Sequence, residues 1–76
     1  MNNPGRALRG LTARRVIAAF ERAGYTIDRT RGSHVVLEHP GRRSIVIPRH
    51  DPVPHGLLLS KIKDAGLTPE EFVTLL

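Results

Sequence analysis

Residues 34–48 read HVVLEHPGRRSIVIP, two short alternating runs separated by a Pro-Gly pair. In the first run Val35 and Leu37 share one face, and in the second Ile45 and Ile47 share one. The Pro-Gly pair between the runs occupies the two central positions of a type II turn. The stretch therefore predicts a β-hairpin with one apolar face.

The segment that precedes this hairpin predicts two further elements. Residues 25–31 (YTIDRTR) alternate and are rich in residues that favour strands, so they predict a third strand. Before it, apolar residues recur at helical spacing over 13–23. Thr12 is a suitable N-cap for this helix, and Gly24 is a suitable residue to end it.

The segment after the hairpin predicts two helices. A proline-rich linker, RHDPVPHG at 49–56, leads into apolar residues at helical spacing over 56–65, and Gly66 ends that helix. The next residues, TPEE at 68–71, supply an N-cap, a first-turn proline and a capping-box glutamate for a short C-terminal helix. The predicted fold class is α+β, in the order α-β-β-β-α. A three-stranded antiparallel sheet packs its apolar face on two helices and leaves its other face partly open.

Length and composition limit the class of protein. With 76 residues the chain has room for one small core, and the absence of cysteine excludes disulfides and cysteine-ligated zinc. Residues 1–10 (MNNPGRALRG) predict a flexible basic tail, followed by a single domain over 11–76. No apolar run is long enough for a membrane span or a secretory signal, so we expect a cytoplasmic protein without a membrane partner.

The charge of the chain is positive and uneven. The net charge is +5, and ten of the twelve basic residues are arginine. Residues 1–49 hold ten arginines against three acidic residues, a net of +7, whereas 50–76 hold two lysines against four acidic residues, a net of −2. The planar guanidinium group matches the geometry of phosphate. A one-sided field of this kind favours a polyanionic partner such as RNA.

His34 is the candidate for chemistry. Alternation places it on the face opposite Val35 and Leu37, at the start of a strand and directly after a tight turn. An imidazole titrates near neutral pH and can both accept and donate a proton, and Arg29 and Arg31 stand near enough to hold a phosphate. From these residues alone, an ordinary surface histidine is the more common interpretation.

The remaining histidines do not predict a metal site. His50 and His55 flank the sequence DPVP, but their spacing matches no standard ligand pattern and no third ligand stands nearby. His39 adjoins the Pro-Gly pair and is expected to be a turn residue. The carboxylates are scattered, whereas metal-dependent nucleases cluster theirs. We therefore expect no metal and no cofactor, and any RNA cleavage should be metal-independent.

Several short motifs follow one another along the chain at a regular spacing. They are Ala23-Gly24-Tyr25, Arg31-Gly32-Ser33-His34, His39-Pro40-Gly41-Arg42, Val46-Ile47-Pro48, a loop that contains histidine, and IKDAGLTPEEF at 62–72. In this order the chain, from Leu11 to Phe72, resembles the HicA family of toxins, which are also described as mRNA interferases. The resemblance implies the fold of double-stranded-RNA-binding domains, in agreement with the predicted order of elements.

The resemblance also implies an activity and its partners. It implies the toxin of a type II toxin–antitoxin system, active in the stress response, an endoribonuclease that cleaves mRNA and inhibits translation. The catalytic residue of the family is the histidine of its Gly-Ser-His motif, here His34, and a cognate HicB-type antitoxin covers the active surface. The RNA 2′-OH would attack the adjacent phosphate while His34 moves protons. The residues expected to bind RNA are Arg29, Arg31, Ser33, Arg42, Arg43 and Lys61.

The candidates for a second proton carrier are His50, Lys61 and Arg31. A non-catalytic double-stranded-RNA-binding module would need the same basic frame, because such domains bind by shape and phosphate contacts. A protein-interaction domain is a third possibility, suggested by the acidic-leaning segment 57–76.

Overall fold

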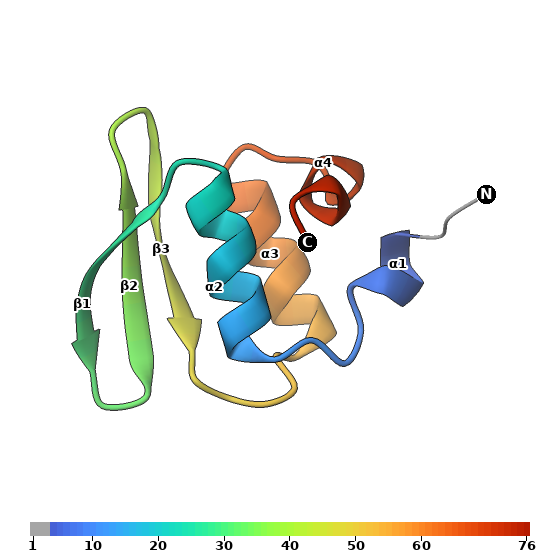
Figure 1. Ribbon diagram of the computed structural model, residues 1–76, viewed down its shortest axis with the longest axis horizontal. Coiled ribbons are helices and arrows are strands. Elements are labelled where there is room, and N and C mark those ends of the chain that lie inside the picture. The colour runs from blue at the N-terminus through green and yellow to red at the C-terminus, as the bar shows by residue number, and fades with distance from the viewer. Residues whose placement is uncertain (1–3) are drawn as a thin grey trace.

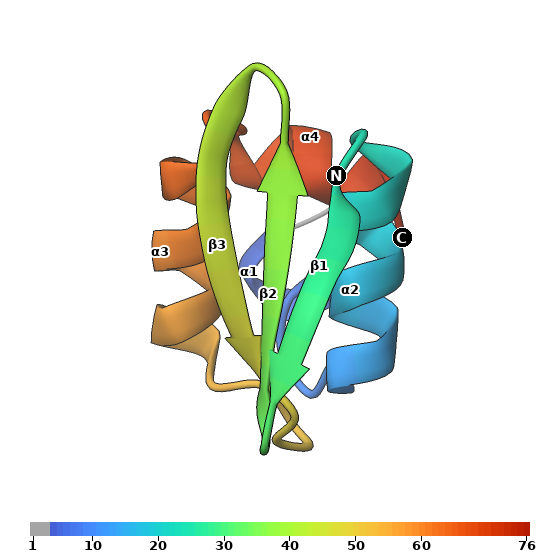
Figure 2. The same cartoon turned by 90° about the vertical axis from the view of Figure 1, so that its left-hand side faces the viewer.

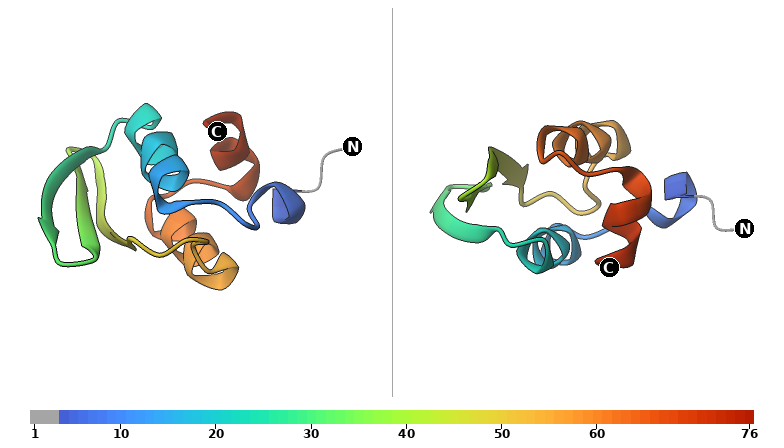
Figure 3. Two further views of the ribbon diagram at one scale, coloured as in Figure 1. Left: turned by 60° about the horizontal axis from the view of Figure 1, so that its bottom comes forward. Right: turned by 90° about the horizontal axis from the view of Figure 1, so that it is seen from above.

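A three-stranded antiparallel sheet in the order β1-β2-β3 forms one layer of the computed structural model, which describes residues 4–76. Helices α2 and α3 cover one face of this sheet, and α1 and α4 lie beyond them (Figures 1 and 3). The elements are α1 (Pro4–Ala7), α2 (Ala13–Arg22), β1 (Thr26–Arg31), β2 (His34–His39), β3 (Arg42–Pro48), α3 (His55–Asp64) and α4 (Pro69–Thr74). The predicted α+β class, the element order and the short C-terminal helix are confirmed.

The sheet buries one face and leaves the other uncovered. Val35, Leu37, Ile45 and Ile47, the predicted apolar face of the hairpin, are all buried against the helices. Each such side chain contributes roughly 1.5–3 kcal/mol by leaving water. Figure 2 looks onto the opposite, outer face of the sheet, which no helix covers.

Helix α2 begins and ends as its local sequence predicts. The hydroxyl of Thr12 accepts the Arg15 backbone N–H at 3.2 Å, which satisfies a donor that has no partner within the helix. At the other end the Tyr25 N–H donates to the Phe20 carbonyl and Gly24 has a φ of +101°, the pattern of a Schellman ending. The rings of Phe20 and Tyr25 pack edge to face, 5.6 Å apart.

Gly24 occupies a position that other residues fit poorly. A Cβ at this position would lie 2.8 Å from Nε2 of His39. We expect Gly24→Ala to lower the free energy of unfolding more than Gly10→Ala, where φ is +72° and the space is open. Both changes cost about 1–2 kcal/mol for the left-handed backbone, but Gly24→Ala must also displace the His39 ring. Urea denaturation of the two variants measures the difference, and equal losses would contradict the prediction.

The C-terminal segment closes the core from the side away from the sheet. Thr68 and Glu71 form the predicted capping box, with bonds of 2.9 and 3.1 Å, and the hydrogen bond from the Thr68 backbone lowers the pKa of the Glu71 carboxyl. In α4, Phe72 is fully buried and its ring centroid lies 4.8 Å from that of Phe20. The short helix therefore completes the core under α2.

The beginning of the described chain differs from the prediction of a flexible tail over 1–10. Residues 4–7 form α1, which packs against α4, and Leu8 is fully buried in the core. The burial of Leu8 and the contact of α1 with α4 both contribute to holding this segment against the rest of the chain. Residues 1–3 of the predicted tail lie outside the described residues.

The turn between β2 and β3 is not the predicted type II turn. That turn type needs a positive φ at Gly41, and Gly41 has none. Nδ1 of His39 instead accepts the Gly41 N–H at 2.9 Å, and the His39 ring packs on Tyr25 with centroids 5.0 Å apart. His39 is thus a turn residue, as predicted, and its side-chain bond accounts for the different turn.

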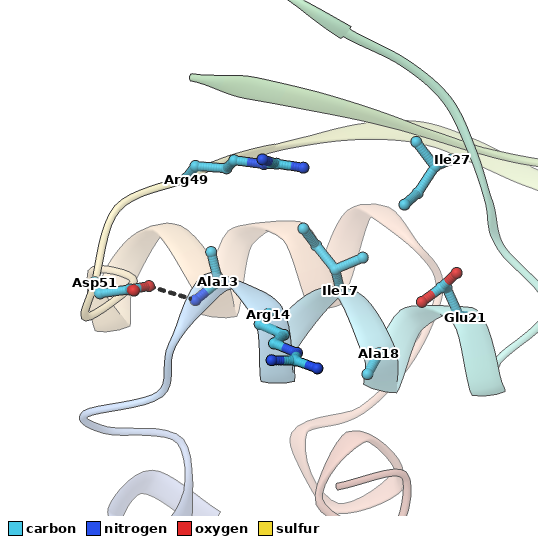
Figure 4. A pocket seen from close by; sticks show the side chains of 8 residues that line it. All are labelled: Ala13, Arg14, Ile17, Ala18, Glu21, Ile27, Arg49 and Asp51. Carbon is cyan, nitrogen blue, oxygen red and sulfur yellow. Dashed lines mark hydrogen bonds between the residues drawn. The ribbon is translucent and has the colours of Figure 1, made fainter. Parts of the chain in front are cut away.

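The proline-rich linker between β3 and α3 is a loop that is bonded to distant parts of the chain. A carboxylate oxygen of Asp51 accepts the Ala13 N–H at 2.7 Å, at the first residue of α2 (Figure 4). The N–H of Val53 donates to the Leu11 carbonyl at 2.8 Å, and the Val53 side chain is buried. These bonds hold the linker against the start of α2.

Candidate active site

His34 is the first residue of β2 and lies on the outer face of the sheet. It pairs with Arg31 of β1 on one side and with Pro48 of β3 on the other. Directly paired residues share a face of the sheet, with Cβ atoms about 5 Å apart. The three side chains therefore form one row across the outer face, whereas the next residue, Val35, points into the core. The predicted outward orientation of His34 is confirmed.

The turn before His34 is hydrogen-bonded to the segment that follows β3. Gly32 has a φ of +60°, as the first central residue of a type II′ hairpin turn requires. The carbonyl of Ser33 accepts the Arg49 N–H at 2.5 Å, which extends the contact beyond Pro48. Arg49 and His50 consequently lie at the His34 end of the sheet.

Arg29 stands in the neighbouring row of the outer face, together with Val36 and Val46. A β-bulge at Asp28 makes this possible, because the extra residue turns Ile27 toward the helices and both arginines of β1 outward. The Arg29 guanidinium forms an ion pair with Asp28 at 2.5 Å. Both side chains are largely exposed, so the pair contributes little and leaves Arg29 able to exchange Asp28 for a phosphate.

Three of the residues expected to bind RNA lie elsewhere. Arg42 is at the opposite end of the sheet, where its guanidinium donates to the Ala65 carbonyl at 2.7 Å after the end of α3. Arg43 is beside it, and its carbonyl accepts the Tyr25 hydroxyl at 2.8 Å. Lys61 belongs to α3, in the helical layer behind the sheet. The structure thus brings Arg29, Arg31 and Ser33 to His34, but not these three.

Burial perturbs a group at the far end of the sheet. It raises the pKa of the Tyr25 hydroxyl, and the positive charge of Arg42 acts in the opposite direction. A protonated hydroxyl is the form that can donate to the Arg43 carbonyl. The packing around Tyr25 therefore causes this pKa shift. The row of Arg31, His34 and Pro48, which we call the His34 row, has no part in it.

Arg49 is the residue near His34 that the sequence interpretation missed. It lies in a proline-rich linker, where a loop was the natural expectation. The strand pairing could have identified Arg49. Counting along the hairpin from its turn pairs His34 with Pro48, and Arg49 is the next residue. Of the three candidates for a second proton carrier, His50 and Arg31 lie at this end of the sheet and Lys61 does not.

Within residues 4–76 no three His, Asp or Glu side chains gather closely enough to hold a metal ion. No helix in the same range has the length and apolar character that crossing a membrane requires.

A comparison with protein-family models decides the family. The model described as HicA toxin of bacterial toxin-antitoxin matches residues 13–67, more than half of the chain. The chain belongs to the HicA toxin family. It is therefore the toxin of a toxin–antitoxin system, and a cognate antitoxin is its partner. A comparison with curated proteins gives no match.

The part of this HicA toxin that matches the family contains the whole His34 row. It runs from the first residue of α2, through the sheet and α3, to Leu67. The matched residues leave out α1, Leu8 and α4, although Leu8 and Phe72 are part of the core. The family model thus covers the candidate active site, while both ends of the described chain complete the packing.

Proposed function

We propose that this HicA toxin is a metal-independent endoribonuclease, an mRNA interferase with His34 as its catalytic residue. The observation that carries the proposal is the exposed His34 on an uncovered sheet face, directly opposite Arg31. A proton carrier beside a phosphate-binding guanidinium is the minimum that RNA cleavage by the 2′-OH needs. Membership in a toxin family supplies a reason for such a site.

Cleavage is an intramolecular attack of the RNA on its own phosphate. The imidazole of His34 takes the proton of the ribose 2′-OH, the 2′-oxygen bonds to the adjacent phosphorus, and the bond from phosphorus to the 5′-oxygen breaks. The Arg31 guanidinium stabilises the negative charge that builds on the phosphate oxygens. The products are a 2′,3′-cyclic phosphate and a 5′-hydroxyl.

The leaving 5′-oxygen needs a proton from a second acid. Among the candidates at this end of the sheet, an imidazole releases a proton near neutral pH, whereas a guanidinium does not. His50 therefore fits this role better than Arg31. Its backbone N–H donates to the Pro48 carbonyl at 2.8 Å, which holds it close to the His34 row.

The proposal is tested by incubating the purified toxin with a defined single-stranded RNA in EDTA. We expect fragments that end in a 2′,3′-cyclic phosphate, and no cleavage of a DNA of the same sequence, which lacks the 2′-OH. A requirement for Mg²⁺, or cleavage of the DNA, would contradict the mechanism. Binding that falls steeply with salt, with all RNA intact, would instead favour the non-catalytic RNA-binding module.

The positions of the basic residues predict unequal effects on RNA binding. In a His34→Ala background, which keeps the RNA intact, Arg31→Ala should remove one phosphate contact. The negative slope of log K against log salt should then become less steep by about 0.7. Lys61→Ala, in the helical layer, should leave the slope unchanged. Fluorescence anisotropy at several salt concentrations measures both, and equal slopes for the two variants would place the RNA elsewhere.

A further inference from the structure

A groove of about 510 Å³ lies between α2 and β1, and we call it the α2–β1 groove (Figure 4). In Figure 4, Ile17 and Glu21 project from α2 toward Ile27 and Arg49 on the sheet side. Four of the residues that line the groove are apolar and four are charged. They are Ala13, Ile17, Ala18 and Ile27, and Arg14, Glu21, Arg49 and Asp51.

Ile27 is the apolar centre of this groove on the sheet side. The bulge at Asp28 turns it toward the helices, where it pairs with the fully buried Leu37. However, α2 and α3 pack against β3 and leave β1 overhanging, so Ile27 remains 47% exposed. A large aliphatic side chain that faces a groove in this way offers an anchoring point for a partner's side chain.

The charges that line the groove favour an acidic occupant. Among residues 4–76, the guanidinium groups of Arg14 and Arg49 form no ion pair. Of the two carboxylates, that of Asp51 already accepts the Ala13 N–H at the N-terminus of α2. The two guanidinium groups are therefore paired with neither Glu21 nor Asp51, and the chain as a whole has a net charge of +5. Carboxylates of a partner would complement this surface.

The strand that borders the groove has a free edge. β1 pairs with β2 alone within the described sheet, so the backbone on its other side is open to an added strand. An extended segment paired there would point every second side chain toward α2, over the groove. Backbone pairing and apolar anchoring are thus available to the same partner segment.

We propose that the α2–β1 groove and the free edge of β1 form a docking surface for the cognate antitoxin. The occupant is an extended segment in which an aliphatic side chain, flanked by carboxylates, inserts between Ile17 and Ile27. Because Arg49 also donates its N–H to the Ser33 carbonyl, a segment held there lies beside the turn that precedes His34. RNA fits less well, because the centre of the groove is aliphatic and no lining residue is aromatic, so the groove offers no surface on which a base could stack.

The test measures antitoxin affinity by titration calorimetry, with the full-length toxin carrying His34→Ala as the parent. We expect Ile27→Asp to weaken binding about 30-fold or more, as for a central interface residue. The matched control Ser60→Asp, on the exposed surface of α3, should change affinity less than threefold. Circular dichroism checks the folding of each variant. Arg14→Glu, an exposed substitution that leaves the core untouched, provides a second measurement and should weaken binding about tenfold.

Affinity that stays within threefold of the parent in both groove variants would overturn the proposal. So would a loss confined to Val46→Asp, because that result would place the antitoxin on the outer face alone. A loss of RNA affinity in Ile27→Asp with unchanged antitoxin binding would assign the groove to RNA instead. The proposal rests on family membership and not on RNA cleavage, so a toxin without nuclease activity would leave this measurement valid.

Discussion

His34→Ala should lower the rate of RNA cleavage by about 10²–10⁴-fold, the usual contribution of a general acid or base. The side chain lies on the outer face of the sheet and outside the core, so the free energy of unfolding should change by no more than about 0.5 kcal/mol. Loss of activity in a folded variant would therefore report on chemistry. Single-turnover cleavage in EDTA, with excess toxin over RNA, measures the rate of the chemical step.

The matched control for this substitution is His39→Asn. It removes a histidine at the opposite end of β2, and the asparagine side chain can still accept the Gly41 N–H that His39 accepts. Cleavage by this variant should stay within twofold of the parent. If His34→Ala retained a tenth or more of the activity, the catalytic role would belong to another residue. Equal losses in both variants would indicate a general structural effect.

Phe72→Ala should have the largest effect on stability, a loss of about 3–5 kcal/mol. The Phe72 ring is fully buried and packs on Phe20, and Phe72 is the only fully buried residue within α4. A 76-residue domain has a total stability of roughly 4–11 kcal/mol, so the variant should be partly or wholly unfolded at 37 °C. Thermal denaturation followed by circular dichroism measures the shift.

A conservative and an exposed substitution separate packing from helix formation in α4. Phe72→Leu keeps most of the apolar volume and should cost less than half as much as Phe72→Ala. Thr74→Ala changes an exposed residue of the same helix and should shift the midpoint little. A loss below about 1 kcal/mol in Phe72→Ala would contradict the assignment of this ring to the core.

Local signals in the sequence predicted most of the elements. A capping residue, a left-handed glycine and the spacing of apolar residues act within a few positions of one another, so both ends of α2 and the start of α4 were recognisable. The alternation in β2 and β3 likewise predicted the buried face of the sheet and the outward side of His34.

The features that escaped prediction depend on contacts between distant segments. The composition of residues 4–8 predicted a tail. It could not reveal that Leu8 is buried, because Leu8 packs against elements far along the chain. Arg42 was predicted to bind the phosphates of RNA. Its guanidinium instead donates to the Ala65 carbonyl, 23 residues away. The groove arises from a bulge at Asp28 that the alternation of residues 25–31 does not reveal.

The loop between β3 and α3 has a further consequence for hydrogen exchange. Loop amides usually exchange with solvent deuterium quickly, because water reaches them without unfolding. Arg49 and Val53 each donate an N–H to a carbonyl in a distant segment, and the loop carboxylate of Asp51 holds the amide of Ala13. Releasing these amides requires the turn before β2 or the start of α2 to move away. This irregular segment should therefore exchange on the timescale of the secondary structure around it.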